Sequence, residues 1–387
     1  MLNSACRLPL SDDDAIRLLE WAVAVPSLSG QEQDCAAVLA SAMARCGMRA
    51  GIDEAGNAVG ILGDGPIDIV LLGHMDTVPG LVPQRREGDL LYGRGTVDAK
   101  GPLCAFIAAA SRAELPAGVR LIVIGATEEE CATSRGARHA AATYRPAACI
   151  IGEPSHWDGV TLGYKGRILV TFTARREVAH TAGPDGSAAD AVLGVVHEFQ
   201  SRVSAVPVKP GSTQSSAGAK AGAFDSIQCT VRSMETRSDG FTDEARVVVG
   251  LRLSPGVQPS EIAELARAAA EGRDVVVTTA GEETAVVADR SNLVARSLSN
   301  AIRDHGGTPT PKRKTGTSDM NVVNPVWNCP IAAYGPGDSA LDHTPNEHIS
   351  LSEYCKSISV LQGAIEAMGR ELVGARPAAE VAGGKRG

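Results

Sequence analysis

The chain lacks the features that would direct it to a membrane, to nucleic acid or to a disulfide-stabilised fold. Its 387 residues contain no apolar run long enough to span a bilayer. The net charge of −8 argues against non-specific nucleic-acid binding, which needs a basic surface. The nine cysteines include no Cys-x-x-Cys pair, so we expect reduced, mostly buried thiols. Residues 1–14 lack the apolar core of a signal peptide, and we therefore expect a cytoplasmic protein.

The first part of the chain has the pattern of a soluble α/β enzyme. Hydrophobic residues make up 44% of the sequence, as is ordinary for globular proteins. Ser11-x-x-Asp14 and Ser29-x-x-Glu32 have the form of capping boxes, each opening an apolar-periodic helix. Between Ile67 and Gly152, short Val/Ile/Leu runs alternate with helical stretches. Such runs are typical of strands buried on both faces of a largely parallel sheet.

The pattern changes after about Gly163, which indicates a second domain. Three segments alternate between apolar and polar positions and predict a half-buried antiparallel sheet, namely 167–175, 227–231 and 247–253. Two helical patterns, 187–203 and 260–271, would cover one side of it, and the resulting order of elements is ferredoxin-like. We predict an inserted small domain over 164–288 and a main domain over 1–163 and 289–387, with a disordered tail from about Ala375.

Histidine and carboxylate residues follow the apolar runs of the first domain. The runs lead into His74-Met75-Asp76, Asp98, Glu128-Glu129-Glu130 and Glu153. Ligands of open α/β sheets bind at the carboxyl ends of the strands, so these side chains are expected to gather there. A histidine among several carboxylates is most simply explained by a metal site, and such ligands suit zinc or cobalt. The Glu triplet can provide both a ligand and a non-ligand base, because neighbouring residues point in different directions.

Five motifs together resemble a known enzyme superfamily. They are Gly73-His74-Met75-Asp76, Gly95-x-x-Asp98-x-Lys100-Gly101, the Glu triplet, Gly152-Glu153-Pro154 and Gly316-Thr317-Ser318-Asp319. This combination resembles the dinuclear-zinc amidohydrolase and exopeptidase superfamily, which includes acetylornithine deacetylase, succinyl-diaminopimelate desuccinylase and glutamate carboxypeptidase. The resemblance implies a zinc-exopeptidase-like α/β catalytic domain with a mixed, mainly parallel sheet. It also implies an inserted ferredoxin-like α+β domain that serves as lid and dimerisation domain.

The resemblance also implies roles for individual residues. Two Zn²⁺ ions, or Co²⁺ in their place, would be bound by five ligands: His74 and Glu153 on one ion, Glu130 and His343 on the other, and Asp98 on both. Glu129 would be the general base, and Asp76 would hold the second nitrogen of His74. In the segment Ala179-His180-Thr181, the histidine would reach the partner's active site in a homodimer and stabilise the oxyanion. Arg252 would bind a carboxylate of the substrate.

One branch of the superfamily looks closest to this sequence. Three longer segments resemble the hydrolases of carrier-protein-dependent lysine and ornithine biosynthesis, namely 152–166, 314–321 and 335–345. Those enzymes cleave the amide between the γ-carboxyl of a carrier protein's terminal glutamate and the α-amine of the finished amino acid. The resemblance therefore implies an acidic amino-group carrier protein as the substrate. The basic clusters Lys312-Arg313-Lys314 and Arg175-Arg176 are either solvated surface or a dock for that carrier.

Two other functions stay open at this point. A deacylase or dipeptidase for small N-acyl amino acids would use the same catalytic atoms. Segment 232–240 argues against a simple acetyl-amino-acid substrate, because it lacks the Asn and Pro that many deacylases carry before the arginine strand. A non-catalytic binding protein with the same fold would be expected to lack ligands or the base, yet every expected position is filled.

Overall fold

The computed structural model describes residues 8–180, 186–208 and 222–375, and the tail for which we expect disorder lies beyond them except for Ala375. Within these ranges, no helix is both long and apolar enough to cross a membrane. The chain divides into two compact units. Unit 1 consists of Met1–Gly163, Ala288–Lys312 and Ser318–Gly387, and unit 2 of Tyr164–Val287 and Arg313–Thr317. The segment 313–317, which the sequence assigned to the catalytic domain, thus belongs to unit 2.

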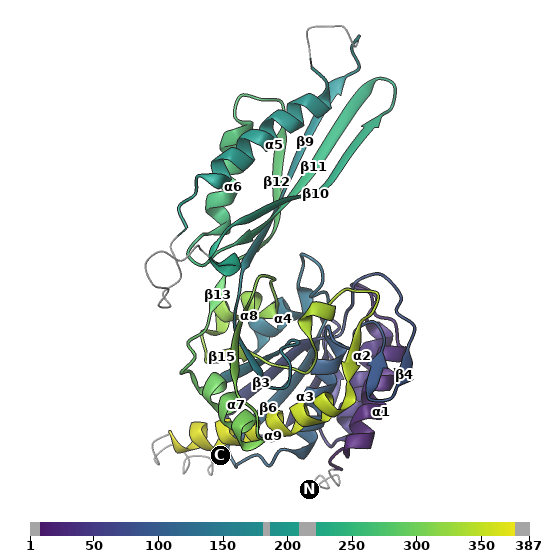
Figure 1. Ribbon diagram of the computed structural model, residues 1–387, viewed down its shortest axis with the longest axis vertical. Coiled ribbons are helices and arrows are strands. Elements are labelled where there is room, and N and C mark those ends of the chain that lie inside the picture. Colours follow the sequence, from purple (N-terminus) through teal and green to yellow (C-terminus); the bar gives the residue numbers. More distant parts are fainter. Residues whose placement is uncertain (1–7, 181–185, 209–221, 376–387) are drawn as a thin grey trace, which may run out of the picture. The chain divides into compact units, whose positions relative to one another are not determined.

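The larger, mixed sheet has the strand order β1-β2-β6-β3-β7-β15-β8-β13, in which β14 pairs with β8; all of its strands except β13 lie wholly or mainly in unit 1. Figure 1 labels β3, β6 and β15 of this sheet. The strands are β1 (Arg49–Ile52), β2 (Ala58–Leu62), β3 (Ile67–His74), β6 (Val119–Ala126), β7 (Ala148–Gly152), β8 (Gly159–Tyr164), β13 (Val286–Val287), β14 (Thr310–Lys314) and β15 (Ile331–Ala333). The central strands β6, β3, β7 and β15 pair in parallel. A smaller sheet has the order β16-β5-β4, formed by β16 (His348–Ser350), β5 (Leu90–Tyr92) and β4 (Arg85–Glu87).

Helices cover the large sheet, and all eight residues of β3 are buried. The helices are α1 (Asp12–Ala24), α2 (Gln33–Arg45), α3 (Lys100–Arg112), α4 (Arg135–Thr143), α7 (Leu293–Asp304), α8 (Asp319–Trp327) and α9 (Leu351–Gly374), with a 3₁₀ turn η2 at Ser339–Leu341. α9 contacts both α3 and α7, and α4 contacts α8. The mixed α/β sheet expected for the catalytic domain is confirmed; its central strands are parallel, whereas β1, β2 and β8 pair antiparallel with their neighbours.

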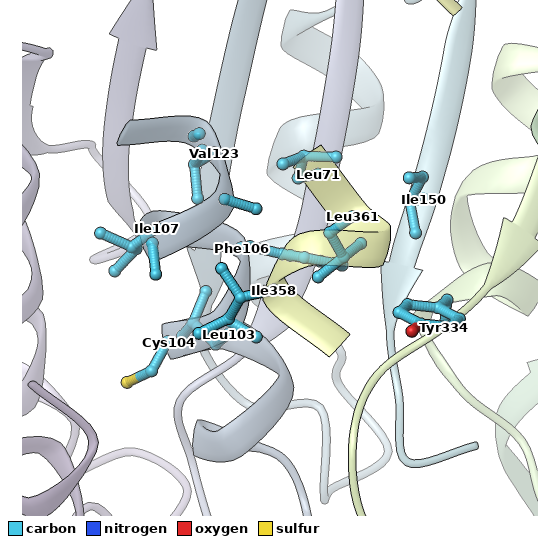
Figure 2. Packing of buried hydrophobic residues seen from close by; sticks show 14 of the residues in the cluster. Leu71, Leu103, Cys104, Phe106, Ile107, Val123, Ile150, Tyr334, Ile358 and Leu361 are labelled. Carbon is cyan, nitrogen blue, oxygen red and sulfur yellow. The ribbon is translucent and has the colours of Figure 1, made fainter. Parts of the chain in front are cut away.

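The core between α3, α9 and the strands fixes the strand ends that carry polar residues. The side chains that meet there are fully buried, and they are Leu71, Leu103, Phe106, Ile107, Val123, Ile150, Ile358 and Leu361 (Figure 2). Burial of one such side chain contributes about 1.5–3 kcal/mol. Lys100, at the start of α3, is also buried, and its ammonium donates to the carbonyls of Ala22 and Val25 at 3.0 and 2.6 Å. The strands that end at these polar residues are therefore part of a densely packed hydrophobic core with α3 and α9.

Only the first of the two predicted capping boxes forms. The hydroxyl of Ser11 accepts from the amide of Asp14 at 3.1 Å, and the Asp14 carboxylate accepts from the amide of Ser11 at 3.3 Å. The second prediction is wrong, because α2 begins after Glu32 without a side-chain cap. The hydroxyl of Ser29 donates instead to Asp76 at 2.7 Å, and Glu32 accepts from the amide of Glu128 at 3.1 Å. Both side chains therefore form hydrogen bonds with loops that are distant in the sequence, instead of capping the helix.

Unit 2 has the element order strand, helix, strand, strand, helix, strand. The elements are β9 (Gly166–Glu177), α5 (Ala188–Ser204), β10 (Gln228–Ser238), β11 (Thr242–Leu253), α6 (Pro259–Ala270) and β12 (Val276–Glu283), with a 3₁₀ turn η1 at Ala223–Asp225. The antiparallel sheet has the order β10-β11-β9-β12. β9 and β11 alternate between buried and partly exposed residues as predicted. Of the half-buried pattern predicted for 227–231, Ile227 and Cys229 pack against the core as predicted, whereas Val231 on the edge strand β10 is 41% exposed.

Candidate metal centre

The candidate ligands of unit 1 lie at one edge of its sheet. His74 is the last residue of β3, Glu129 and Glu130 follow β6, and Glu153 follows β7. These three strands are parallel neighbours in register, so their carboxyl ends meet at the same edge. Asp98 lies in the loop before α3, and His343 in the loop between η2 and β16. The fold thus brings together all five residues that the sequence proposes as ligands.

Two groups of three side chains share one carboxylate. The ligand atoms of His74, Asp98 and Glu153 lie within 4.8 Å of one another, and so do those of Asp98, Glu130 and His343. Oδ1 of Asp98 is 3.1 Å from Nε2 of His74, and Oδ2 of Asp98 is 2.9 Å from Nε2 of His343. Nε2 of His343 also lies 2.9 Å from Oε1 of Glu130. Each oxygen of Asp98 therefore faces a different histidine, as is needed for a carboxylate shared by two ions.

Negative charge accumulates in this cluster. Burial raises the pKa of Glu129 well above its ordinary value; the charge of His74 opposes this rise, and the carboxylates of Asp319 and Glu153 add to it. Burial and the charge of Asp98 likewise raise the pKa of Glu130. Neighbouring carboxylates contribute to both rises, so several negative charges lie close together and would be balanced by positive charge. Divalent cations would provide that charge.

The histidines respond to the same excess of carboxylates. Hydrogen bonds with Asp98 and Glu130 raise the pKa of His343 to about 10. Burial alone would lower the pKa of His74, but hydrogen bonds with Asp76 and Asp98 raise it well above its ordinary value. Two imidazole nitrogens and three carboxylates, one of them shared, form a donor set that suits zinc and similar divalent ions. The residues present therefore fit a pair of divalent metal ions.

Asp76 orients His74 and also holds the Glu triplet. Nδ1 of His74 is 3.0 Å from the backbone oxygen of Asp76 and 3.3 Å from Oδ1 of its carboxylate. This contact leaves Nε2 of His74 directed at Asp98, an arrangement common for metal-binding histidines. The same buried carboxylate accepts from the amides of Glu129 and Glu130, each at 3.0 Å. One side chain thus fixes both a ligand and the segment that carries the candidate base.

Two of the predicted site residues, His180 and Arg252, belong to unit 2. His180 follows β9 and is exposed. Arg252 lies in β11, opposite Arg167 of β9, and its guanidinium donates to the hydroxyl of Thr317. The roles expected for His180 and Arg252 stay predictions.

Three buried carboxylates around the cluster had no predicted role in the metal centre. Asp319 is the first residue of α8, and its charge raises the pKa of Glu129. Glu32 holds the amide of Glu128, although its spacing from Ser29 had indicated a helix cap. Glu347 is fully buried and binds the loop that carries Asp98. Of the three, only Asp319 had a signal in the sequence, its place in the Gly316-Thr317-Ser318-Asp319 motif.

Comparison with known proteins identifies the family. The model of the peptidase family M20/M25/M40 matches residues 70–367. The chain belongs to this family. A relative from Deinococcus radiodurans named [LysW]-lysine hydrolase is 47% identical to this M20/M25/M40 protein over 362 residues, which cover 92% of this chain and 98% of the relative. A putative [LysW]-lysine/[LysW]-ornithine hydrolase from Thermococcus kodakarensis is 36% identical over 379 residues, covering 97% of each chain.

Solved structures of the family share the fold of this M20/M25/M40 protein. An M20 family metallo-carboxypeptidase from Sulfolobus solfataricus superimposes with a TM-score of 0.75 at 17% identity, covering 92% of this chain and all of that one. A Bacillus subtilis protein described as a dinuclear metal binding peptidase has a TM-score of 0.63 at 12% identity, covering 94% and 99%. The resemblance proposed from the five motifs is therefore confirmed, and the protein is a metallo-hydrolase of this family.

Proposed function

We propose that the protein releases a lysine- or ornithine-like amino acid from an acidic amino-group carrier protein. The bond cleaved is the amide between the γ-carboxyl of the carrier's terminal glutamate and the α-amine of the amino acid. The observation that carries this proposal is the 47% identity, over nearly the whole of both chains, with a relative named for hydrolysis of a LysW-lysine conjugate. No observation of comparable weight favours a small N-acyl amino acid as the substrate.

The metal centre that we propose holds two Zn²⁺ ions, for which Co²⁺ is a substitute. His74 and Glu153 would hold one ion, Glu130 and His343 would hold the other, and Asp98 would be shared between them. The two groups of side chains that share Asp98 support this assignment. Bound there, two such ions would supply polarisation of the scissile carbonyl and would lower the pKa of the attacking water.

Glu129 is the general base of the proposed reaction. It belongs to neither of the two groups that share Asp98, and its carboxylate lies close to the ligand atoms of His74 and Glu130, beside the proposed ions, as a base for the attacking water must. Its backbone amide is fixed by Asp76, which limits the positions that its side chain can reach. Glu129 takes a proton from the attacking water and delivers it to the departing α-amine. This transfer converts the amine into a better leaving group as the C–N bond breaks.

Two residues of unit 2 complete the proposed mechanism. We assign the protein to a homodimer in which His180 of one subunit donates a hydrogen bond to the oxyanion formed in the other. Arg252 binds a carboxylate of the substrate. Its hydrogen bond to Thr317, in a motif shared with the superfamily, supports this assignment because it holds the guanidinium in one place.

A comparison of two substrates tests the proposed function. The zinc-loaded enzyme is given a carrier protein with lysine on its terminal γ-carboxyl and, in parallel, Nα-acetyl-lysine. We expect kcat/KM to be about 100-fold or more higher for the carrier-bound substrate, because contacts remote from the scissile amide contribute binding energy that the small substrate lacks. Release of free lysine is measured for both, with enzyme treated with a chelator as the control. Preference for the acetylated amino acid would contradict the proposal and assign the protein to the small-substrate deacylases.

The structure limits which basic residues are suited to dock the carrier. Lys312 donates to the carbonyl of Ser155 at 2.7 Å, and the guanidinium of Arg313 lies 5.4 Å from the ring of Phe224. Arg175 is exposed, although it pairs with Glu244. Lys312 therefore has a structural contact of its own, whereas Arg175 presents its charge to solvent.

Neutralising the cluster Arg175-Arg176 tests the docking surface. For the double variant Arg175→Gln, Arg176→Gln we expect KM for the carrier-bound substrate to rise several-fold at low ionic strength, with kcat unchanged. The reason is that complementary charge on an interface acts mainly on association and is screened by salt. Steady-state kinetics at low and high salt measure the effect, and KM for Nα-acetyl-lysine is the control. An unchanged KM for the carrier at low salt would remove these arginines from the docking surface.

A further inference from the structure

Glu347 is a fully buried carboxylate whose two oxygens are occupied by one neighbouring loop. Its Oε1 accepts from the amides of Gly95, Val97 and Asp98 at 2.9, 3.0 and 3.2 Å. Its Oε2 accepts from the guanidinium of Arg94 at 2.7 Å. Several backbone amides that converge on one oxygen fix the path of the chain between them. The loop just before α3 therefore has its conformation set by a side chain from far along the sequence.

Arg94 extends this network to further segments. Besides its contact with Glu347, its guanidinium donates to the carbonyl of Gly80 at 3.0 Å and to that of Thr344 at 3.4 Å. The side chain of Arg94 is only 12% exposed, and that of Glu347 is not exposed. A charged pair in such a position persists when its hydrogen bonds are satisfied, as they are here. The pair thus connects the loop after β3, the loop before α3 and the loop that leads into β16.

The segments connected in this way carry candidate ligands of both ions. Asp98 contributes one of the three amides bound by Glu347, and its carboxylate faces His74 and His343. His343 lies four residues before Glu347 in the same loop. Glu347 itself belongs to none of the metal-binding groups found among the described residues. Its contacts are with the backbone that positions ligands.

We propose that Glu347 is a positioning residue of the metal centre. It fixes the backbone at Asp98 relative to the loop that carries His343, so that the Asp98 carboxylate faces the other ligands of both groups. This inference rests on the metal centre of the proposed function and is independent of the substrate. A purely architectural role would lower the stability of the fold and leave the affinity for metal unchanged. A positioning role changes the affinity in a protein that is still folded.

The variant Glu347→Gln tests the proposal with a side chain of nearly the same size. Its amide keeps one oxygen, but its NH₂ group cannot accept a hydrogen bond from a backbone amide or from Arg94. We expect the affinity for Zn²⁺ to fall by about 10- to 100-fold, as is common when residues that hold metal ligands are changed. Competition with a chromophoric chelator measures this affinity. The d–d absorption of the Co²⁺-loaded protein reports the ligand geometry and is expected to change as well.

Asp68→Asn is the matched control. Asp68 is another poorly exposed carboxylate that pairs with an arginine, since its two oxygens accept from Arg120 at 2.7 Å each. It lies near the start of β3, whereas His74 is at the end of that strand. We expect Asp68→Asn to lower the melting temperature and to bind Zn²⁺ like the unchanged protein. The comparison separates loss of stability from loss of ligand geometry.

The possible results distinguish this inference from the function on which it rests. Unchanged Zn²⁺ affinity and an unchanged Co²⁺ spectrum in folded Glu347→Gln would overturn it. If that variant does not fold, Glu347→Asp is tested instead, because it keeps the charge but is one methylene too short to make all four contacts. Weakened metal binding in Glu347→Asp would support the inference, and unchanged metal binding would overturn it. Failure of the unchanged protein to bind two ions per chain would overturn both the metal centre and this inference. Preference for a small substrate would overturn only the carrier proposal.

Discussion

Replacing Glu129 by glutamine is expected to remove nearly all turnover while the protein keeps its metal. A positioned general base typically contributes about 10²- to 10⁴-fold to the rate, and an amide cannot accept the proton of the attacking water. The metal content should not change, because Glu129 is not one of the five proposed ligands, although its carboxylate lies near those of His74 and Glu130. Release of lysine from the carrier gives kcat, and elemental analysis of the purified variant gives the number of ions per chain.

Glu128→Gln is the matched control for this experiment. Glu128 is the preceding residue of the same triplet, and its carboxylate accepts from the hydroxyl of Thr133 at 2.5 Å. We expect this variant to keep both its metal and most of its activity. Loss of metal together with activity in Glu129→Gln would contradict the assignment of the base. That result would mean that the metal ligand and the general base within the Glu triplet are not the residues proposed for these roles.

The pattern of the sequence predicted the elements that place the ligands. β3 reads as a continuous apolar run because it is buried on both faces, and β9 alternates because only one of its faces is buried. Parallel strands bring their carboxyl ends to one edge, so the apolar pattern alone predicts that the residues following such strands lie together. Which oxygen of Asp98 faces which histidine depends on the path of the loops, and no local pattern encodes it.

The carboxylates around the centre show where prediction from sequence ends. Some are placed to bind metal, whereas Glu32, Asp76 and Glu347 accept hydrogen bonds from the amides of ligand-bearing loops. Both kinds are acidic side chains shielded from solvent, and they differ only in what their oxygens meet. Asp76 was found because it is close to a histidine in sequence. Glu32 and Glu347 were missed because their partners lie 96 and about 250 residues away.

Mixing two inactive variants tests whether His180 of one subunit acts in the active site of the other. His180→Asn is expected to lower kcat by about 10²- to 10³-fold, which is the usual cost of losing one donor to an oxyanion. Glu129→Gln is inactive for a different reason. In a mixed dimer, one site combines an intact Glu129 with His180 of the other subunit and is complete. Random exchange of subunits should make about half of all dimers mixed. Because each mixed dimer has one complete site out of two, up to about a quarter of the wild-type activity should return.

The control for this recovery is a mixture that has no complete site. The double variant Glu129→Gln, His180→Asn combined with Glu129→Gln lacks the base in every subunit and should stay inactive. Different affinity tags on the two variants establish that mixed dimers have formed. Recovered activity in the first mixture alone would mean that each active site is built from two chains. Mixed dimers without recovery would mean that His180 acts within its own chain or not at all, and the homodimer would then have no part in the chemistry.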